Sequence, residues 1–306
     1  MASTQFMKLE PQAPMYFFVP KDFDVLAEYE KGFGVSELFV VNSVGIVTAR
    51  DAVLVNDSKE ELLKNVENFY QNKADENLVQ KISYRPFDNK FIYYDVKLVG
   101  RARERVMQHF LRGENWGLVF KFGNAEKNSS PIYATKNLID FRSWSRPGMQ
   151  GGDYTAPLYL YNQETSLSPT TRTPNLNHKI IAEISQKLSL KFIPDHELPE
   201  ATSKDNFSPL DLLDYIYATL NSPSYREKYK EFLKIDFPHV PYPSDSQEFW
   251  RLVAIGSELR KTHLLEGEKF NGVRNLITKY SIAGSNKVET IKGLLQIPKQ
   301  FLHKFL

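Results

Sequence analysis

The chain has 306 residues, which suits one large domain or two smaller ones, and its hydrophobic share of 42% and charged share of 25% are typical of globular proteins. It contains no cysteine, which excludes disulfides and thiolate metal sites, and no apolar run of the roughly 18–20 residues that a membrane span requires. The formal charge of +2 identifies no partner, because a basic face can be hidden in the total, and we expect a cytoplasmic protein with no signal peptide and no membrane contact.

The first half of the chain is predicted to mix strands with helices. Ser58, followed three residues later by Glu61, forms a capping box, and the apolar spacing behind it predicts an amphipathic helix to about Tyr70. A basic helix is predicted from Arg101 to Leu111. Short apolar runs between turn residues predict strands at 15–19, 38–41, 45–48, 52–55, 81–87, 91–97 and 117–122, with a turn at 88–89.

The pattern becomes helical towards the C-terminus. A loop rich in glycine and proline at 143–155 precedes a predicted strand at 157–161, and a second loop or linker follows at 166–174. Helical spacing then predicts helices at 177–190, 209–221, 223–235 and 246–264. The sequence therefore predicts an α+β protein, with a mixed α/β domain at 14–200 and a helical section at 201–306.

Motifs for catalysis are missing from the sequence. An amino-methyltransferase needs an Asn/Asp/Ser-Pro-Pro-aromatic loop to hold the target amino group, and the chain has no Pro-Pro pair. The nearest glycine-rich turn, at 32–34, follows charged residues instead of a buried strand, and no phosphate-binding loop occurs. The histidines do not pair at helical spacing. We therefore predict no catalytic residue, no metal site and no cofactor in this chain.

One faint pattern keeps a metal-dependent nuclease open as an alternative. Asp95 and Lys97, with Asp88 upstream, resemble the two acidic residues and one lysine that converge on Mg²⁺ in such enzymes. The competing interpretation is a strand that has one solvent-facing charge at either end.

Positive charge interleaved with aromatic rings is the pattern that points to a partner. Basic residues that leave strand ends and helix starts can grip phosphates or reach base edges. The competing interpretations are a solvated basic helix face, a plain turn at 48–51, and a structural pairing of Arg85 with Asp88. The predicted DNA-binding residues are Thr48, Arg50, Arg85, Lys90, Arg101, Arg103 and Arg105.

Six ordered segments carry a resemblance to a known family. The stretch 208–241 contains Tyr-Ile-Tyr-Ala, Ser-Pro-Ser-Tyr-Arg and Asp-Phe-Pro-His-Val-Pro, and the others are 45–51, 82–94, 103–118, 156–161 and 256–265. Together they resemble the C-terminal DNA-specificity (target recognition) region of type ISP and type IIG restriction–modification enzymes, which are adenine-specific DNA methyltransferases. The resemblance covers residues from about 14 to about 290.

This resemblance implies a function in DNA recognition. In that family the region follows the methyltransferase, reads a short asymmetric sequence in double-stranded DNA, and holds the duplex while a base is flipped into the neighbouring catalytic pocket. It implies a target recognition domain at 14–200 that is non-catalytic by itself, with double-stranded DNA and a methyltransferase domain or subunit as partners. S-adenosylmethionine would belong to the associated methyltransferase part.

The departures from the family pattern leave alternatives. His239 stands where the family usually has arginine, the methyltransferase, helicase and nuclease parts are missing upstream, and the C-terminus stops short of a tryptophan-containing tail. We therefore expect a fragment, a split subunit or a truncated gene product. The alternative to a DNA reader is a structural or protein-interaction module left from a decayed restriction–modification system, or a metal-dependent nuclease.

Overall fold

The computed structural model describes residue 8 and residues 23–86, 88–123, 132–145, 151–162 and 171–266. The described residues belong to one unit that ends at Glu266. The strand predicted at 15–19 lies outside them. None of the helices in these residues combines the length and apolar character that crossing a bilayer requires.

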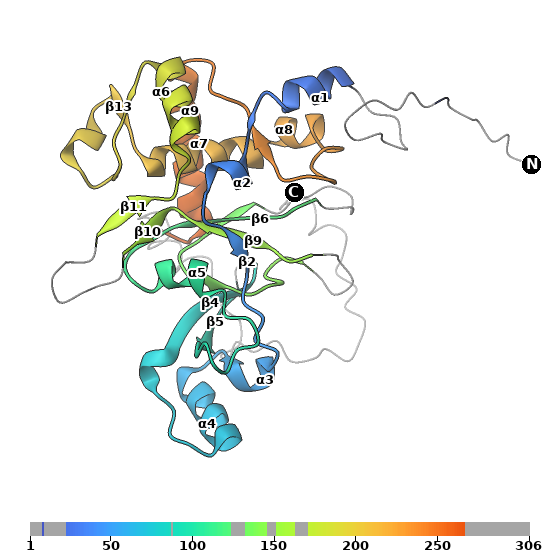
Figure 1. The fold of residues 1–306 in the computed structure, drawn as a ribbon, viewed down its shortest axis with the longest axis vertical. Helices are drawn as coiled ribbons and strands as arrows, with labels where there is room; N and C mark the ends of the chain where they lie inside the picture. The colour runs from blue at the N-terminus through green and yellow to red at the C-terminus, as the bar shows by residue number, and fades with distance from the viewer. Residues whose placement is uncertain are drawn as a thin grey trace, which may run out of the picture. The chain divides into compact units, whose positions relative to one another are not determined.

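Two four-stranded sheets form the middle of this unit (Figure 1). The first is wholly antiparallel, in the order β2 (Ser43–Val44), β9 (Tyr154–Pro157), β6 (Gly117–Phe120) and β7 (Tyr133–Thr135). The second has the order β3 (Val55–Asn56), β5 (Asp88–Tyr93), β4 (Val79–Arg85) and β8 (Leu138–Ile139), and only its β4–β8 pair is parallel. Because β7 and β8 follow each other in the chain, residues 136–137 pass from one sheet to the other.

Three two-stranded pairs complete the described β-structure. They are β1 (Phe33–Gly34) with β14 (His239–Val240), β10 (Tyr159–Tyr161) with β11 (Arg172–Pro174), and the parallel pair β12 (Lys191–Phe192) with β13 (Asn206–Phe207).

Each of the two sheets is covered by a different set of helices. Figure 1 shows α7 and α9 on the side of the β2-β9-β6-β7 sheet, while α3 and α4 lie next to β3 and β5 at the other end. The α-helices are α1 (Phe23–Tyr29), α2 (Val35–Leu38), α3 (Asp51–Leu54), α4 (Lys59–Tyr70), α5 (Glu104–Met107), α6 (His178–Leu188), α7 (Pro209–Asn221), α8 (Pro223–Lys228) and α9 (Ser246–His263). Short 3₁₀ helices are η1 (Glu76–Leu78), η2 (Gln108–Phe110) and η3 (Pro199–Thr202).

The α7 helix shows how local sequence sets an element. Ser208 accepts a hydrogen bond from the Asp211 backbone at 3.3 Å, and the Asp211 carboxylate accepts one from the Ser208 backbone at 2.8 Å, which completes a capping box. Pro209 occupies the first helical position, where its missing N–H costs nothing. The helix ends at Asn221, because Pro223 forces the residue before it out of the helical region.

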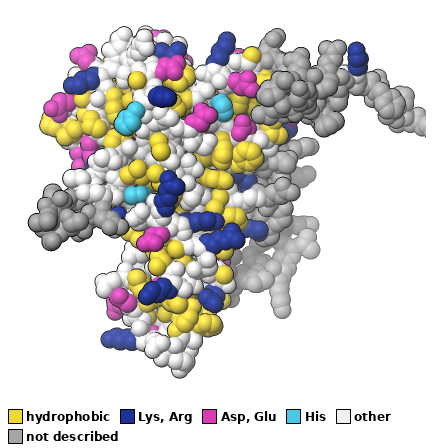
Figure 2. Space-filling view, in the orientation of Figure 1, with side chains coloured by type: hydrophobic (Ala, Val, Ile, Leu, Met, Phe, Trp, Pro, Cys, Tyr) yellow, Lys and Arg dark blue, Asp and Glu magenta, His cyan; other side chains and the backbone are white. Residues whose placement is uncertain are grey.

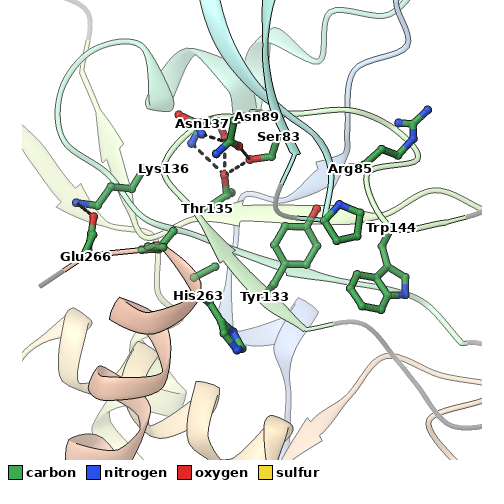
Figure 3. A pocket seen from close by; sticks show the side chains of 13 residues that line it. Ser83, Arg85, Asn89, Tyr133, Thr135, Lys136, Asn137, Trp144, His263 and Glu266 are labelled. Carbon is green, nitrogen blue, oxygen red and sulfur yellow. Dashed lines mark hydrogen bonds and ion pairs between the residues drawn. The ribbon is translucent and has the colours of Figure 1, made fainter. Parts of the chain in front are cut away.

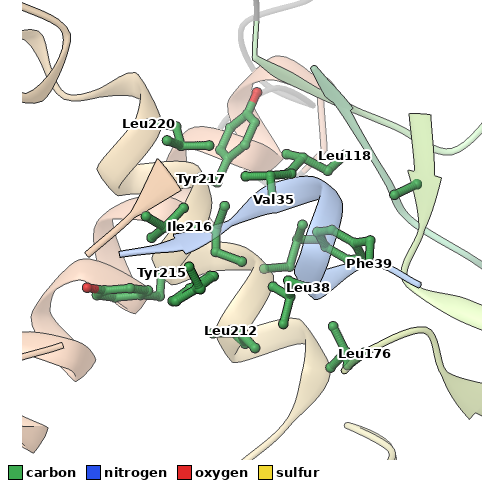
Figure 4. Close-up of a cluster of buried hydrophobic side chains, with 14 of the residues drawn as sticks. Val35, Leu38, Phe39, Leu118, Leu176, Leu212, Tyr215, Ile216, Tyr217 and Leu220 are labelled. Carbon is green, nitrogen blue, oxygen red and sulfur yellow. The ribbon is translucent and has the colours of Figure 1, made fainter. Parts of the chain in front are cut away.

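Two hydrophobic clusters make up the described core. The larger surrounds α7 and joins α2, β6, β9, α6 and α9, and Figure 4 shows Val35, Leu38 and Phe39 packed against Ile216 and Tyr217. The smaller holds α4 and α5 against β4 and β5. The larger cluster draws residues from before and after residue 200, and the division of the chain at that point stays a prediction.

Two apolar runs predicted as strands do not form strands over most of their length. In the run 38–41, Leu38 is the last residue of the short helix α2, whose Val35 and Leu38 are both buried three positions apart on one face, and residues 39–41 are irregular. Residues 52–55 form most of α3, where one helical turn buries Leu54 and only Val55 enters a sheet. The run at 45–48 is mostly irregular, with β2 ending at Val44.

Two predicted helices are shorter than expected, and one turn is displaced. The basic helix begins only at Glu104, because Arg101 is held by backbone hydrogen bonds to Val47. The helix predicted at 223–235 ends at Lys228 and continues as turns. Asp88 and Asn89 lie inside β5, so the expected turn at 88–89 falls earlier in the chain.

Candidate nucleic-acid interface

Two loops bring three of the predicted DNA-binding residues, Thr48, Arg50 and Arg101, to one place. Residues 47–51 run beside residues 98–101: the Val47 N–H donates to the Arg101 carbonyl at 3.1 Å, and the Arg101 N–H returns a bond of 2.8 Å. Gly100 permits this approach, since a Cβ atom there would lie 3.1 Å from the Val47 carbonyl oxygen. The Arg50 guanidinium donates to the Leu98 carbonyl at 3.1 Å, which ties the two loops together again.

Asp51 connects this pair of loops to the β4–β5 hairpin. Its carboxylate accepts hydrogen bonds from the Thr48 hydroxyl and, at 2.8 Å, from the Tyr84 hydroxyl. The Arg85 guanidinium lies 3.9 Å from the centre of the Tyr84 ring, and the Lys90 ammonium lies 5.2 Å from it. Burial, together with the bond to Asp51, raises the pKa of Tyr84 to about 12, so the phenol keeps its proton at neutral pH.

The cations of this surface are of two kinds: compensated ones, which pair with a carboxylate, and uncompensated ones, which do not. Arg85 pairs with Asp140 at 2.9 Å, and Lys90 pairs with Asp57 at 3.2 Å. No described carboxylate pairs with the arginines at 50, 101, 103 and 105, and those at 50, 101 and 105 are exposed. Figure 2 shows Lys and Arg side chains gathered across the middle of one face, over the region that Figure 1 labels α5 and β2. A solvated cation without a carboxylate is free to neutralise a phosphate.

Three expectations about individual residues are corrected by these positions. Thr48 is only 1% exposed and its hydroxyl donates to Asp51, so it does not lie on the surface where we expected it. Arg85 is held by a carboxylate, but by Asp140 in place of the expected Asp88. Arg101 precedes α5 and so lies outside the basic helix that was predicted to begin at it.

Arg103 has an unusual backbone. It caps α5 in the left-handed region, with a φ of 54°, which costs a non-glycine residue roughly 1–2 kcal/mol. Its Nε atom is buried and has no hydrogen-bond partner among the described residues. Strain and an unmatched donor in one arginine are features that functional sites tolerate.

Two exposed basic residues, at 97 and 142, were not among the predicted DNA-binding residues. Arg142 lies on the turn after β8, and its backbone N–H donates at 2.9 Å to the Asp140 carboxylate that also holds Arg85. Lys97 is exposed beside the loop that carries Arg101. Nothing local marks Arg142, because the parallel pairing of β4 with β8 is what brings it near Arg85. Lys97 had entered only the nuclease pattern.

The nuclease pattern does not converge in the structure. Asp88 begins β5 and Asp95 lies beyond its end, so at about 3.3 Å per residue the two are separated by on the order of 16 Å or more. The Asp95 carboxylate accepts a bond from the Lys97 backbone at 2.8 Å, as in a local turn. The described residues contain no cluster of three side chains able to hold a metal ion.

Comparison with known proteins points to one family. The family model described as the type ISP C-terminal specificity domain matches residues 71–293. No curated protein matches the chain.

Three solved structures have a similar fold. A cryo-EM structure of a DrdV–DNA complex matches with 21% identity and a TM-score of 0.57, over 74% of this chain and 23% of that one. The ATP-dependent type ISP restriction–modification enzyme LlaBIII bound to DNA matches with 19% identity and a TM-score of 0.58, over 78% and 17%. A nuclease-deletion mutant of the type ISP enzyme LlaGI, in complex with a DNA substrate mimic, matches with 18% identity and a TM-score of 0.54, over 77% and 19%. At these identities the likeness concerns the fold, and the chain spans less than a quarter of each of these proteins.

Proposed function

The chain belongs to the family of type ISP C-terminal specificity domains, and from that premise we propose that it recognises a specific sequence in double-stranded DNA. It would do so as the specificity part of a restriction–modification adenine methyltransferase, without catalysis of its own. A methyltransferase domain or subunit would be its partner and would hold S-adenosylmethionine. The three solved structures of similar fold are all of proteins in complex with DNA, and two of them are type ISP restriction–modification enzymes, which supports the proposal.

The observation that carries the proposal is the group of uncompensated arginines on the two tied loops. Arg50 and Arg101 are exposed on backbone that is fixed by hydrogen bonds, and Arg105 follows on α5. A rigid base suits DNA recognition, because less side-chain and loop entropy is lost when the contacts form. Arg85 and Lys90 already have carboxylate partners, so each releases fewer counterions on binding than a free arginine does.

The proposal assigns two kinds of contact to these residues. Arg101 and Arg105 are assigned to phosphates, whose contacts set position but not sequence. Arg50, which leaves the 47–51 loop, is assigned to a base edge, where a bidentate contact to guanine contributes roughly 1–3 kcal/mol of discrimination.

A salt series separates these contacts. Duplexes selected from a random library are bound in competition at 50–200 mM salt, with the alanine variants of Arg50, Arg85, Arg101 and Arg105. Arg101→Ala and Arg105→Ala should each lower the salt slope by about one unit and weaken every duplex alike. When the slope of log affinity against log salt concentration falls by about 0.9, raising the salt from 50 to 200 mM weakens binding of the variant roughly 3.5-fold less than binding of the wild-type protein.

The remaining variants and a control complete the test. Arg50→Ala should instead relax the preference at one base pair, and Arg85→Ala should change the slope less than Arg101→Ala. Arg251→Ala, at an exposed arginine on α9, should change nothing. Equal behaviour of all these variants would place the DNA surface elsewhere, and absence of duplex binding at every salt concentration would favour the structural or protein-interaction module.

A further inference from the structure

Figure 3 shows a pocket of about 220 Å³, and the arginines at 50, 101 and 105 are not among the residues that line it. It forms where the β4–β5 hairpin meets the turn between β7 and β8 and the C-terminal end of α9. Pockets for drug-sized ligands usually measure roughly 300–1,000 Å³, so this one suits a smaller group.

One wall of the pocket is a closed network of hydroxyl and amide groups. The Ser83 hydroxyl lies 2.9 Å from that of Thr135 and donates to the Asn89 side-chain oxygen at 3.1 Å. The Asn137 side-chain NH₂ donates to the same Asn89 oxygen at 3.2 Å, and its backbone N–H donates to Thr135 at 3.0 Å. Three elements, β4, β5 and the β7–β8 turn, therefore hold the two amides in fixed orientations.

This network leaves the Asn89 NH₂ group and the Asn137 side-chain oxygen for a ligand. The Asn89 oxygen already accepts two bonds, and no described residue accepts from its NH₂ group. The Asn137 NH₂ group donates one of its two N–H bonds to Asn89, and no described residue donates to its oxygen. The wall thus offers an amide donor beside an amide acceptor, which is the complement of the paired donor and acceptor on the Watson–Crick edge of a nucleobase.

Aromatic rings line another side of the pocket. The centres of the Tyr133 and Trp144 rings lie 6.4 Å apart, and Figure 3 shows both rings on the side away from Asn137 and Lys136. The Trp144 backbone is fixed by a 2.7 Å hydrogen bond to the Asp153 carboxylate. A flat heteroaromatic ligand can stack on such rings, and each base–aromatic stack contributes roughly 1–3 kcal/mol.

The cations beside the pocket are already neutralised, which argues against a phosphate ligand. Lys136 contacts Glu114 at 2.8 Å and Glu266 at 2.7 Å, and Arg85 contacts Asp140 at 2.9 Å. An anion would have to compete with these carboxylates, whereas a neutral polar ring would not.

We propose that this pocket binds one unpaired nucleobase, through the Asn89–Asn137 amide pair and the rings of Tyr133 and Trp144. The base comes either from a duplex in which it is unpaired or from a free nucleoside. The first source rests on the proposed function, and the second does not.

Tryptophan fluorescence of the full chain tests the proposal with three probes. They are a duplex with one bulged base, the same duplex fully paired, and free adenosine, cytidine, guanosine or thymidine. The bulged duplex should bind at least fivefold tighter than the paired one and quench the fluorescence. Trp144→Phe should remove the quenching while fluorescence anisotropy of labelled DNA still reports binding.

Variants of the two asparagines show whether the pocket causes the tighter binding of the bulged duplex. Asn137→Ala and, independently, Asn89→Ala should bring the bulged duplex to the affinity of the paired one. Asn68→Ala, at an exposed asparagine on α4, should not, and thermal melting should verify that each variant folds.

The possible outcomes distinguish the two proposals. Equal affinity for bulged and paired duplexes, unchanged in both amide variants, overturns the pocket proposal and leaves DNA recognition standing. If neither duplex binds, the proposed function fails, and quenching by nucleosides that depends on Trp144 and Asn137 still supports the pocket. Competition of inorganic phosphate with the nucleosides would overturn the proposal that the pocket binds a nucleobase.

Discussion

Replacing Gly256 by alanine should destabilise the protein, although helix propensity alone predicts the opposite. Gly256 is buried in α9 against α7, and a Cβ atom there would lie 1.8 Å from the Asp214 carbonyl oxygen and 2.6 Å from its carbonyl carbon. Ordinary contact begins at 3.4 Å, so the two helices must separate locally by 3.4 − 1.8 = 1.6 Å. Neither atom is the end of a flexible side chain that can turn away.

The expected loss of unfolding free energy follows from the contacts that this separation of the helices disturbs. Asp214 and Arg260 form a buried ion pair between the same helices, with Nε–Oδ1 and Nη2–Oδ2 distances of 2.6 and 3.0 Å. Overpacking costs about 1–3 kcal/mol, and breaking a buried pair costs about 3–5 kcal/mol. The gain from replacing glycine in a helix is only about 1 kcal/mol, so we expect a net loss of about 3–7 kcal/mol.

Denaturant unfolding measures this difference. Ala254→Gly, at an exposed position two residues earlier on α9, is the control and should cost about 1 kcal/mol. Gly256→Ala should also disturb the pocket, because His263, Leu264 and Glu266 at the end of α9 line it. A variant as stable as the wild-type protein, or more stable, would refute the claim that close backbone packing dominates at this position.

Two further predictions concern stability. Leu233 is 7% exposed within the larger cluster, so Leu233→Ala should lower the free energy of unfolding by about 2–5 kcal/mol, and unchanged stability with selective loss of DNA binding would contradict its place in the core. Burial lowers the pKa of His109, whose Nδ1 accepts the Tyr161 N–H at 3.0 Å, so the unfolded chain takes up the proton first as the pH falls. The contribution of His109 should be complete above the unfolded pKa of about 6.5 and decline below it by up to about 1.4 kcal/mol per pH unit. Unfolding at pH 5–7 should therefore show a weaker pH dependence in His109→Asn, and equal slopes in both proteins would contradict the assignment.

Local signals in the sequence predicted the long helices well. The α7 helix has the predicted bounds, because its cap at Ser208 and the stop at Pro223 depend on a few neighbouring residues. The α4 and α9 helices agree within about one residue, for the same reason. Where distant residues decide, the predictions were wrong: the backbone bonds to Val47 prevent Arg101 from joining a helix.

The sequence predicted which residue types form the candidate interface, but not which of its cations pair with a carboxylate. The arginines at 50, 101 and 105 are recognisable as charges that leave regular elements, and the structure places all three on the surface. Whether a cation is compensated depends on tertiary contacts, such as that of Arg85 with Asp140, which lies 55 positions away. The Asn89–Asn137 pair is likewise invisible in the sequence, because it exists only where two sheets meet.

The pairing of β1 with β14 can form only late in the synthesis of the chain. Tyr29 accepts a hydrogen bond from the His239 backbone at 3.0 Å, across 210 positions of the chain, and Phe33 pairs with Val240. At roughly 5–20 residues per second, the ribosome needs on the order of 10–40 s to supply this partner. During that interval the apolar side chains of α2 lack the strand and helices that bury them, so the nascent chain presents a hydrophobic segment to chaperones until β14 has emerged.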